Sequence, residues 1–345
     1  MRRRRWLIYI LTFIVAGAFT LLKVPLASSQ GTTLVAAQVE GELPLEDPDS
    51  PLWQQATAIE VPLSAQTVTK PKILETRVKS VAARALHDGS KVAFLLEWAD
   101  DTKNDQTIRV QDFRDAVALQ FPVTEGQPFF CMGMQGGNVD IWHWKADWQA
   151  DIAAWQDMET AYPNMDVDQY PHTRGDLPAG SLPAPSDYED VNYVPALASG
   201  NLLASPHLSP VEDIVAGGFG TLTAEPIAGQ NVQGYGVWAD GKWRVIFSRD
   251  AASPDTEDAS FSQGKVYSIA FAAWDGANGE RNGQKSTSQW ISFQLEQQGK
   301  APAAAEGAQQ PTEAGLPVQT YTWVILGAAL LLILVGALIY MRLPE

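Results

Sequence analysis

A succession of short alternating runs constrains the fold of this chain more than any other feature of its sequence. In these runs, rich in β-branched and aromatic residues, apolar and polar positions alternate as in half-buried strands, and Gly or Asp turns flank them. No regular alternation of strands with helices appears. We therefore predict a mainly β fold, an antiparallel β-sandwich with short helices. The runs that predict strands are 56–63, 73–86, 91–98, 115–123, 138–144, 234–249, 265–274 and 288–297.

Within the run 234–249, the stretch "GVWADGKWRVIF" predicts a β-hairpin. Asp240 and Gly241 stand between two alternating segments, where a two-residue turn needs positive φ angles.

Residues from about 150 to 220 interrupt the strand pattern with a segment rich in Pro, Gly, Asp and Tyr. The stretch "ADWQADIAAWQDMETAY" near its start predicts a short helix, and the rest reads as a long irregular insertion. A loop of this length inside a compact domain is usually functional or faces a partner.

Both ends of the chain are apolar. Residues 1–30 combine four arginines, an apolar run and small residues, which predicts a signal peptide or an N-terminal anchor. Residues 321–342 predict a C-terminal transmembrane helix, and 298–320 form a linker of low complexity. The positive residues outside both spans predict that residues 31–297 form an exported domain, tethered to the cell membrane on its extracytoplasmic side.

Composition excludes several kinds of site. The chain has one Cys, too few for a disulfide framework, a Cys-rich zinc site, a protein-ligated iron–sulfur cluster or covalently attached haem. Its formal net charge of −16 disfavours nucleic acid as a partner and suits a cationic soluble protein. The four histidines are scattered without metal-binding spacing.

The segment 128–149, "PFFCMGMQGGNVDIWHWKADWQ", is the main candidate site. It holds Met132, Met134 and three tryptophans, so it predicts either a crowded core or the wall of a pocket for a large, flat, apolar ligand. A thioether is soft and neutral, and it serves to fill cores or to bind copper(I) or haem iron.

Four segments of the chain resemble, in the same order, the haem-b-binding gamma subunits of the ethylbenzene dehydrogenase and dimethyl-sulfide dehydrogenase type. These subunits accompany type II molybdoenzymes of the dimethyl-sulfoxide-reductase group. The resemblance covers roughly residues 40–297. The segments are "FFCMGMQGGNVDIWHWKADWQ", "YPNMDVDQYP", "PVEDIVAGGFGTLT" and "AFAAWDGANGERNGQKSTSQW".

This resemblance implies that a methionine sulfur and a lysine amine hold the haem iron. The family's Met-Gly motif falls on Met132, and its Glu-Arg-x-Gly-x-Lys-Ser motif places the lysine at Lys285. Met134 is the alternative axial ligand. Trp142 and Trp144 are expected to contact the porphyrin. His143 lies on the opposite side of the same strand and is expected to point away from the iron.

The resemblance also implies a function. The chain would be a non-catalytic subunit with one non-covalent haem b, relaying electrons between an iron–sulfur subunit and a soluble cytochrome c or a membrane carrier. The molybdopterin subunit of the same complex would be the enzyme.

Two other functions remain open at this stage. One is a haem-free carbohydrate-binding module on the cell surface, with Trp142, Trp144 and Trp148 as a platform on which sugars stack. The other is an adhesion or assembly protein that docks partners through its Pro-rich loop.

Overall fold

The structure is a computed structural model that describes residues 32–124, 132–165, 196 and 199–297. The chain divides into two units, Met1–Ala305 and Glu306–Glu345, and every described residue belongs to the first. The predicted signal or anchor, linker and C-terminal helix lie outside the described residues. Of the helices that are described, none has the length and hydrophobicity needed to cross a membrane.

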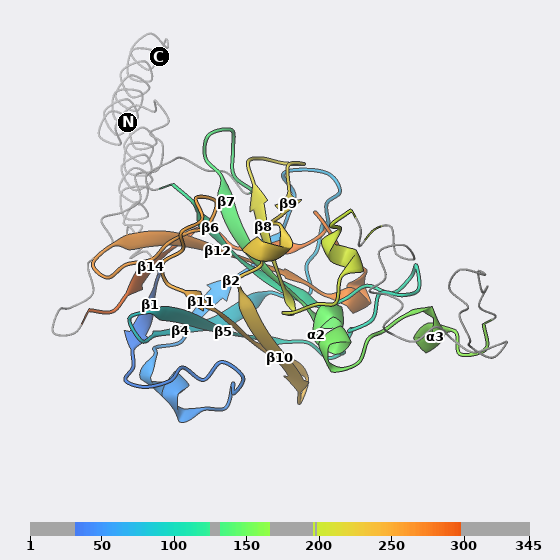
Figure 1. Ribbon diagram of the computed structural model, residues 1–345, viewed down its shortest axis with the longest axis horizontal. Coiled ribbons are helices and arrows are strands. Elements are labelled where there is room, and N and C mark those ends of the chain that lie inside the picture. Colours follow the sequence, from blue (N-terminus) through green and yellow to red (C-terminus); the bar gives the residue numbers. More distant parts are fainter. Residues whose placement is uncertain (1–31, 125–131, 166–195, 197–198, 298–345) are drawn as a thin grey trace, which may run out of the picture. The chain divides into compact units, whose positions relative to one another are not determined.

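The described part of the chain is mainly β, as predicted, with few and short helices (Figure 1). The strands are β1 Thr33–Gln38, β2 Ile59–Pro62, β3 Ser64–Ala65, β4 Ser80–His87, β5 Lys91–Ala99, β6 Ala116–Pro122, β7 Val139–Lys145, β8 Val211–Ala216, β9 Thr223–Ala224, β10 Gln233–Ala239, β11 Lys242–Asp250, β12 Val266–Trp274, β13 Ser286–Thr287 and β14 Ile291–Leu295. The helices are α2 Ala146–Ala153 and α3 Met158–Ala161, with 3-10 turns η1 Pro51–Gln55, η3 Leu202–Ala204, η4 Ile227–Gly229 and η5 Gly276–Asn278.

The strands form two layers that share β12. One layer follows the order β10-β11-β5-β4-β1-β14-β12, and the other continues as β12-β6-β7-β8-β9. The first part of β12 pairs with β14 from Val266 to Ile269, and the remainder pairs with β6 from Ala270 onward. In Figure 1 the two layers lie one above the other, so the two faces that meet enclose a core.

Most of the described pairings are antiparallel, but the sheet is mixed, and the sequence did not indicate its one parallel strand. β1 lies between β4 and β14 and runs parallel to both, with Ala36 opposite Ala85 and Val35 opposite Gln294. Hairpin connections force neighbouring strands to be antiparallel, but β1 pairs only with strands far along the chain, which leaves its direction free. Its partners therefore could not be read from local alternation.

One correction concerns the insertion. Strand β8 lies inside the range predicted as irregular and pairs with β7 in register, with Ile141 opposite Ile214. Its sequence "VEDIVA" carries two adjacent acidic residues, which broke the alternation that would have indicated a strand. The predicted helix and the hairpin at Asp240-Gly241 are confirmed.

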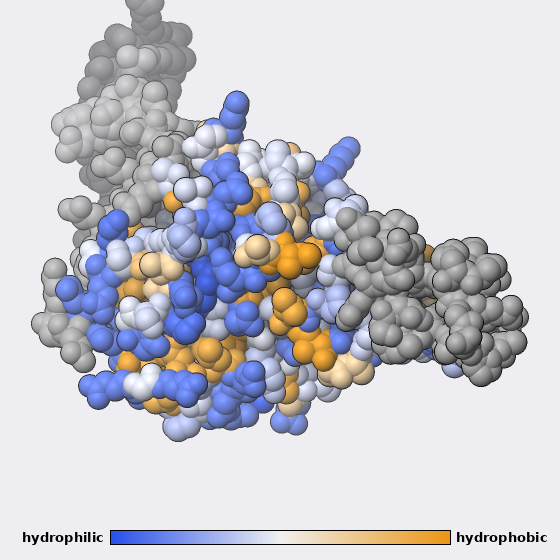
Figure 2. All heavy atoms as spheres, in the orientation of Figure 1, coloured by the Kyte–Doolittle hydropathy of each residue, from blue (hydrophilic) through white to orange (hydrophobic). Residues whose placement is uncertain are grey.

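The core between the layers is built from aromatic rings. Phe94 of β5 meets Trp142 of β7 with ring centroids 5.8 Å apart, and Trp144 meets Trp243 of β11 at 4.9 Å. All four rings are buried, and burying a large apolar side chain contributes roughly 1.5–3 kcal/mol each. Figure 2 shows hydrophilic residues over much of the outside of this body. The two tryptophans of β7 therefore determine which face of this strand packs into the core.

Candidate functional site

A cavity of ≈ 430 Å³ opens on the outer face of the layer that contains β6, β7, β8 and β12. Because side chains alternate across a strand, the residues between the core-facing positions form its floor. The floor is made of small or aliphatic side chains, which leave a flat apolar surface. These are Ala116 and Ala118 of β6, Ile141 of β7, Ile214 of β8, and Ala270 and Ala272 of β12.

The walls of the cavity come from the loops around this sheet and add aromatic and cationic groups. They include Gln66, Pro71, Thr107, Phe113, Arg114, Met132, Phe219, Leu222, Trp274, Arg281, Lys285 and Trp290.

Met132 enters the cavity from the turn before β7. Its φ is +72° and that of Gly133 is +73°. A side chain on Gly133 would place Cβ 2.6 Å from the Ala216 carbonyl oxygen and 2.8 Å from that of Gly137. A non-glycine residue with positive φ is strained by about 1–2 kcal/mol, and such residues cluster at functional sites. The left-handed backbone of the Met-Gly pair therefore directs the Met132 thioether into the cavity.

Lys285 enters the cavity from a different loop, after a tight turn. Arg281 and Gln284 exchange both backbone hydrogen bonds across that turn, at 3.0 and 2.8 Å. The Lys285 carbonyl accepts a hydrogen bond of 2.9 Å from the Gln66 amide, which fixes the lysine backbone. Its Nζ lies 3.6 Å from Met132 Sδ and 5.0 Å from the centre of the Trp274 ring. Two residues far apart in sequence are thus brought into contact.

Met134 occupies a different environment. Its backbone amide and carbonyl pair with those of Gly137 at 3.0 and 2.8 Å. Its side chain is half-buried and does not line the cavity, whereas Met132 does. Of the two candidate methionines, Met132 is the one that meets Lys285.

The structure reverses the expected sides of β7. Trp142 and Trp144 point into the core, fully buried, and do not line the cavity. His143, expected to point away, lines it instead, with its ring centroid 4.7 Å from that of Trp274. The prediction that adjacent positions face opposite sides was right, but the side assigned to the ligand was wrong.

The His143 ring has an unusual hydrogen-bonding state and an unusual pKa. Its Nε2 is buried and has no hydrogen-bond partner among the described residues. Burial lowers the pKa of His143 well below its ordinary value, and the charges of Lys145, Arg114 and Lys285 lower it further. The cavity wall therefore presents a neutral imidazole with an unsatisfied nitrogen.

The proposed sugar platform is absent from the described surface. Trp142 and Trp144 are in the core, and Trp148 is 4% exposed, stacked on His207 at 3.9 Å. Lys145 Nζ also contacts Trp148, 3.8 Å from the centre of its ring. Stacking on a sugar needs an open aromatic face, so these three tryptophans do not supply one.

The residues present fit a haem group. A thioether and an amine are both ligands for haem iron or other soft-to-borderline metals, and here they meet inside an apolar cavity. The volume lies within the range of roughly 300–1,000 Å³ common for cofactor sites, and a floor rich in alanine leaves room for a flat ring.

Some functional residues escaped sequence reasoning. His143 was assigned to the wrong side, and Arg114 and the alanine floor were not singled out. A signal did exist for the floor: alanines recur at alternate positions in "AVALQ" and "AFAAW", which indicates a strand face with no bulky groups.

Comparison with known proteins shows which family the sequence is similar to. The family model described as ethylbenzene dehydrogenase matches residues 50–286. A chain named respiratory nitrate reductase heme subunit, from Haloferax mediterranei, is 24% identical over 324 residues, covering 91% of this chain and 90% of the relative. The chlorate reductase gamma subunit of Ideonella dechloratans is 25% identical and covers 70% of this chain and 77% of the relative. The dimethylsulfide dehydrogenase gamma subunit of Rhodovulum sulfidophilum is 23% identical, with 71% and 73% covered.

Proposed function

Because the chain belongs to the ethylbenzene dehydrogenase family, we propose that it is a non-catalytic electron-transfer subunit that binds one haem b without covalent links. The observation that carries the proposal is the contact of 3.6 Å between Lys285 Nζ and Met132 Sδ inside the apolar cavity. Two similar chains are named as gamma subunits of redox enzymes and a third as a haem subunit, which supports the same function.

In this proposal Met132 and Lys285 would hold the haem iron. Haem bound there would supply one-electron redox chemistry. Lysine ligates only as the neutral amine, so the cavity must keep water away from Lys285. The walls at Trp274 and Trp290 are suited to that role.

The partners follow from the kind of complex to which the similar gamma subunits belong. We propose a molybdopterin catalytic subunit and an iron–sulfur subunit on one side of the relay, and a soluble cytochrome c or a membrane carrier on the other. The apolar ends of the sequence support a location at the cell membrane, with the main domain on its extracytoplasmic side.

A pair of methionine variants tests the ligand assignment on the full chain. Met132→Ala is expected to abolish the low-spin spectrum of the reduced protein and to shift its midpoint potential strongly, because the thioether that meets Lys285 is gone. Met134→Ala is the matched control, two residues away and outside the cavity, and it is expected to leave both unchanged. The measurement is the reduced-minus-oxidised absorption spectrum with a redox titration.

Lys285→Ala completes this test. Loss of the low-spin spectrum in that variant supports the lysine as second ligand. A wild-type chain that is colourless and takes up no added haem would reject the whole proposal. A spectral change in Met134→Ala but not in Met132→Ala would assign the methionine ligand to Met134 instead.

A further inference from the structure

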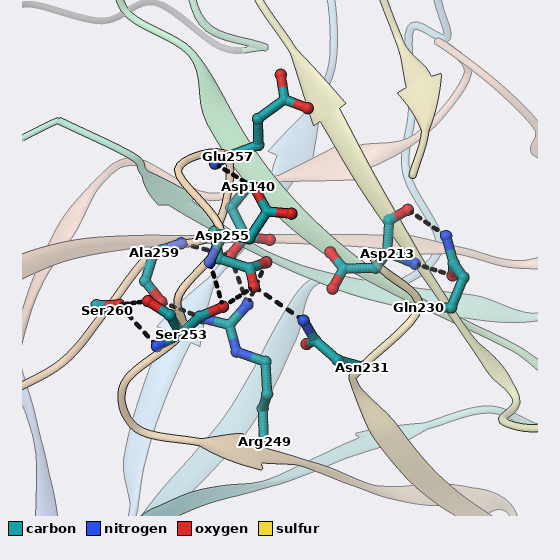
Figure 3. A network of polar contacts seen from close by, with 11 residues as sticks. Asp140, Asp213, Gln230, Asn231, Arg249, Ser253, Asp255, Glu257, Ala259 and Ser260 are labelled. Atoms are coloured by element: carbon teal, nitrogen blue, oxygen red, sulfur yellow. Dashed lines mark hydrogen bonds and ion pairs between the residues drawn. The ribbon is translucent and has the colours of Figure 1, made fainter. Parts of the chain in front are cut away.

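Three buried carboxylates lie together on the core side of β7 and β8, behind the floor of the cavity (Figure 3). They are Asp140 of β7, Asp213 of β8 and Asp258 of the loop after β11, and each offers an oxygen within 4.8 Å of the others. Asp140 and Asp213 are 0% exposed and Asp258 is 4% exposed. Charged groups this deep require partners.

Arg249 satisfies part of this cluster. Its Nη1 donates to Asp140 Oδ2 at 3.1 Å and to Asp258 Oδ1 at 2.7 Å. The other oxygen of Asp258 accepts hydrogen bonds from Asn231, at 2.8 Å, and from the Ser253 hydroxyl. Asp258 and one side of Asp140 are therefore well bonded.

The remaining oxygens are open. Asp140 Oδ1, both oxygens of Asp213 and both oxygens of Glu225 are buried and have no hydrogen-bond donor among the described residues. Glu225 follows β9 and is itself 4% exposed. An unsatisfied buried carboxylate costs several kcal/mol. Figure 3 shows the Asp213 side chain pointing from β8 toward Asp140.

The backbone around these open oxygens is held rigidly. Gln230 Oε1 accepts from the Asp213 amide at 2.8 Å, and Gln230 Nε2 donates to the carbonyls of Asp213 and Glu225 at 2.9 Å each. The Glu225 amide also donates to the Asp213 carbonyl at 3.0 Å. One amide side chain thus clamps both main chains while both carboxylates stay unengaged, the arrangement of a preorganised cation site.

The charges do not balance without a further positive group. Burial raises the pKa of Asp213, and the charges of Asp140 and Glu225 raise it further. Burial also raises the pKa of Glu225 to about 7. Three carboxyl groups, those of Asp140, Asp213 and Asp258, surround the single guanidinium of Arg249. Either a proton held between Asp140 and Asp213 or a bound cation must therefore neutralise the remaining charge.

A second acidic cluster shows the contrast. In the group Asp100, Asp115 and Asp275, Asp115 accepts hydrogen bonds from the Asn104 and Gly276 amides and from the Trp243 indole, at 2.7, 2.9 and 2.9 Å. Only Asp100 Oδ2 is open there. That cluster is a hydrogen-bonded junction of loops, whereas in the cluster at Asp213 one oxygen of Asp140 and both oxygens of Asp213 accept no hydrogen bond.

We propose that Asp140, Asp213 and Asp258 bind a calcium ion. The donors are all hard oxygens, which Ca²⁺ prefers and takes in irregular arrangements of six to eight ligands. The ion joins β7, β8 and the loop after β11. It thereby braces the strand whose other face carries Ile141 and His143 into the cavity.

The test uses the full chain with and without Ca²⁺, and it does not depend on the haem. After extensive dialysis against metal-free buffer and reloading with CaCl₂, elemental analysis is expected to find one calcium per chain. Chelation with EDTA is expected to lower the thermal midpoint by roughly 5–10 °C, because an ion that binds only the folded state stabilises it.

The Asp213→Asn variant distinguishes neutralisation of the cluster by a bound cation from neutralisation by a bound proton. With a calcium site, the variant loses the bound calcium and the response to EDTA. In EDTA its thermal midpoint is expected to lie close to that of the wild type. Asp100→Asn in the second cluster is the matched control and keeps the wild-type response.

Two outcomes overturn the proposal. One is a wild-type chain that retains no calcium and whose midpoint ignores EDTA, a result that decides the question even if Asp213→Asn does not fold. The other is an Asp213→Asn chain that still responds to calcium as the wild type does.

Discussion

At the scale of single residues, the Met-Gly pair carries the site. Both residues have positive φ, and a Cβ on Gly133 would come closer than 3 Å to two backbone carbonyl oxygens. The sequence could rank Met132 above Met134 only through a family resemblance. What separates the two methionines is backbone conformation and the neighbouring β8 strand, and neither is visible in the local sequence.

Gly133→Ala is therefore expected to be costly. The new Cβ would overlap the Ala216 carbonyl, so the turn must shift, and we expect a loss of about 2 kcal/mol or more in the free energy of unfolding. Haem content should fall with it, because Met132 is displaced. Denaturant titration and the haem-to-protein ratio measure both effects.

Gly136→Ala is the control for this variant. Gly136 also has a positive φ, +80°, but no atom lies within 4 Å of the position of its Cβ. It is expected to cost only about 1 kcal/mol of conformational strain. Equal losses in the two variants would contradict the role assigned to close packing at Gly133.

At the scale of elements, β7 shows which features of a strand could be predicted from its sequence and which could not. Its alternation correctly separated Trp142 and Trp144 from His143. Both faces of β7 are covered, one by the core and one by the cavity, so its sequence "VDIWHWK" is rich in apolar or aromatic side chains in both phases. Alternation gives two faces but does not say which one lines a cavity, and the resemblance led us to expect the tryptophans there, whereas His143 lines it.

Neighbouring alanines of β12 test the separation of the two faces. Ala272 lies on the cavity floor, and Ala273 lies in the core. Ala272→Leu is expected to fill the floor and abolish haem uptake while changing the free energy of unfolding by less than about 1 kcal/mol. Ala273→Leu overpacks the core and is expected to cost about 1–3 kcal/mol.

The readouts are haem content after reconstitution and the denaturant midpoint. Full haem uptake by Ala272→Leu would mean that this floor is not the binding surface.

At the scale of the whole molecule, long-range pairing limits what the sequence predicts. Asp140, Asp213 and Asp258 come from three separate segments, so no local spacing marks them as a cluster. A weak signal did exist for Asp140, which stands between Val139 and Ile141 in a predicted strand. Each of the eight predicted runs contains a strand, although in 73–86 the strand begins only at Ser80. β1 was missed because its partners are distant, β8 because its acidic residues break the alternation, and β3, β9 and β13 because each has only two residues.

The stability of the whole domain is expected to depend on pH through Asp115. Burial raises the pKa of Asp115 from 3.8 to about 7, and the charge of Asp100 adds to this. Between these values the folded protein holds a proton that the unfolded chain has released. Stability therefore falls as pH rises through this window and levels off above it.

Asp115→Asn is expected to remove this pH dependence. The part of the change in the free energy of unfolding that depends on Asp115 is at most about 4 kcal/mol, at about 1.4 kcal/mol per pKa unit. The measurement is the free energy of unfolding between pH 4.5 and 7.5. Asp250→Asn, at an exposed ion pair with Lys91, should keep the wild-type slope. Parallel curves for Asp115→Asn and the wild type would contradict the assignment.

The parallel placement of β1 has a consequence for the timing of folding. Thr33 stands opposite Ser292, and the Gln38 amide donates to the Glu296 carboxylate across 258 positions of sequence. A ribosome delivers β14 near the end of this domain, so until then β1 has one vacant edge of amides and carbonyls. A chain cut short before residue 291 would keep that edge exposed, and such truncated products are expected to be the species that aggregate or are degraded.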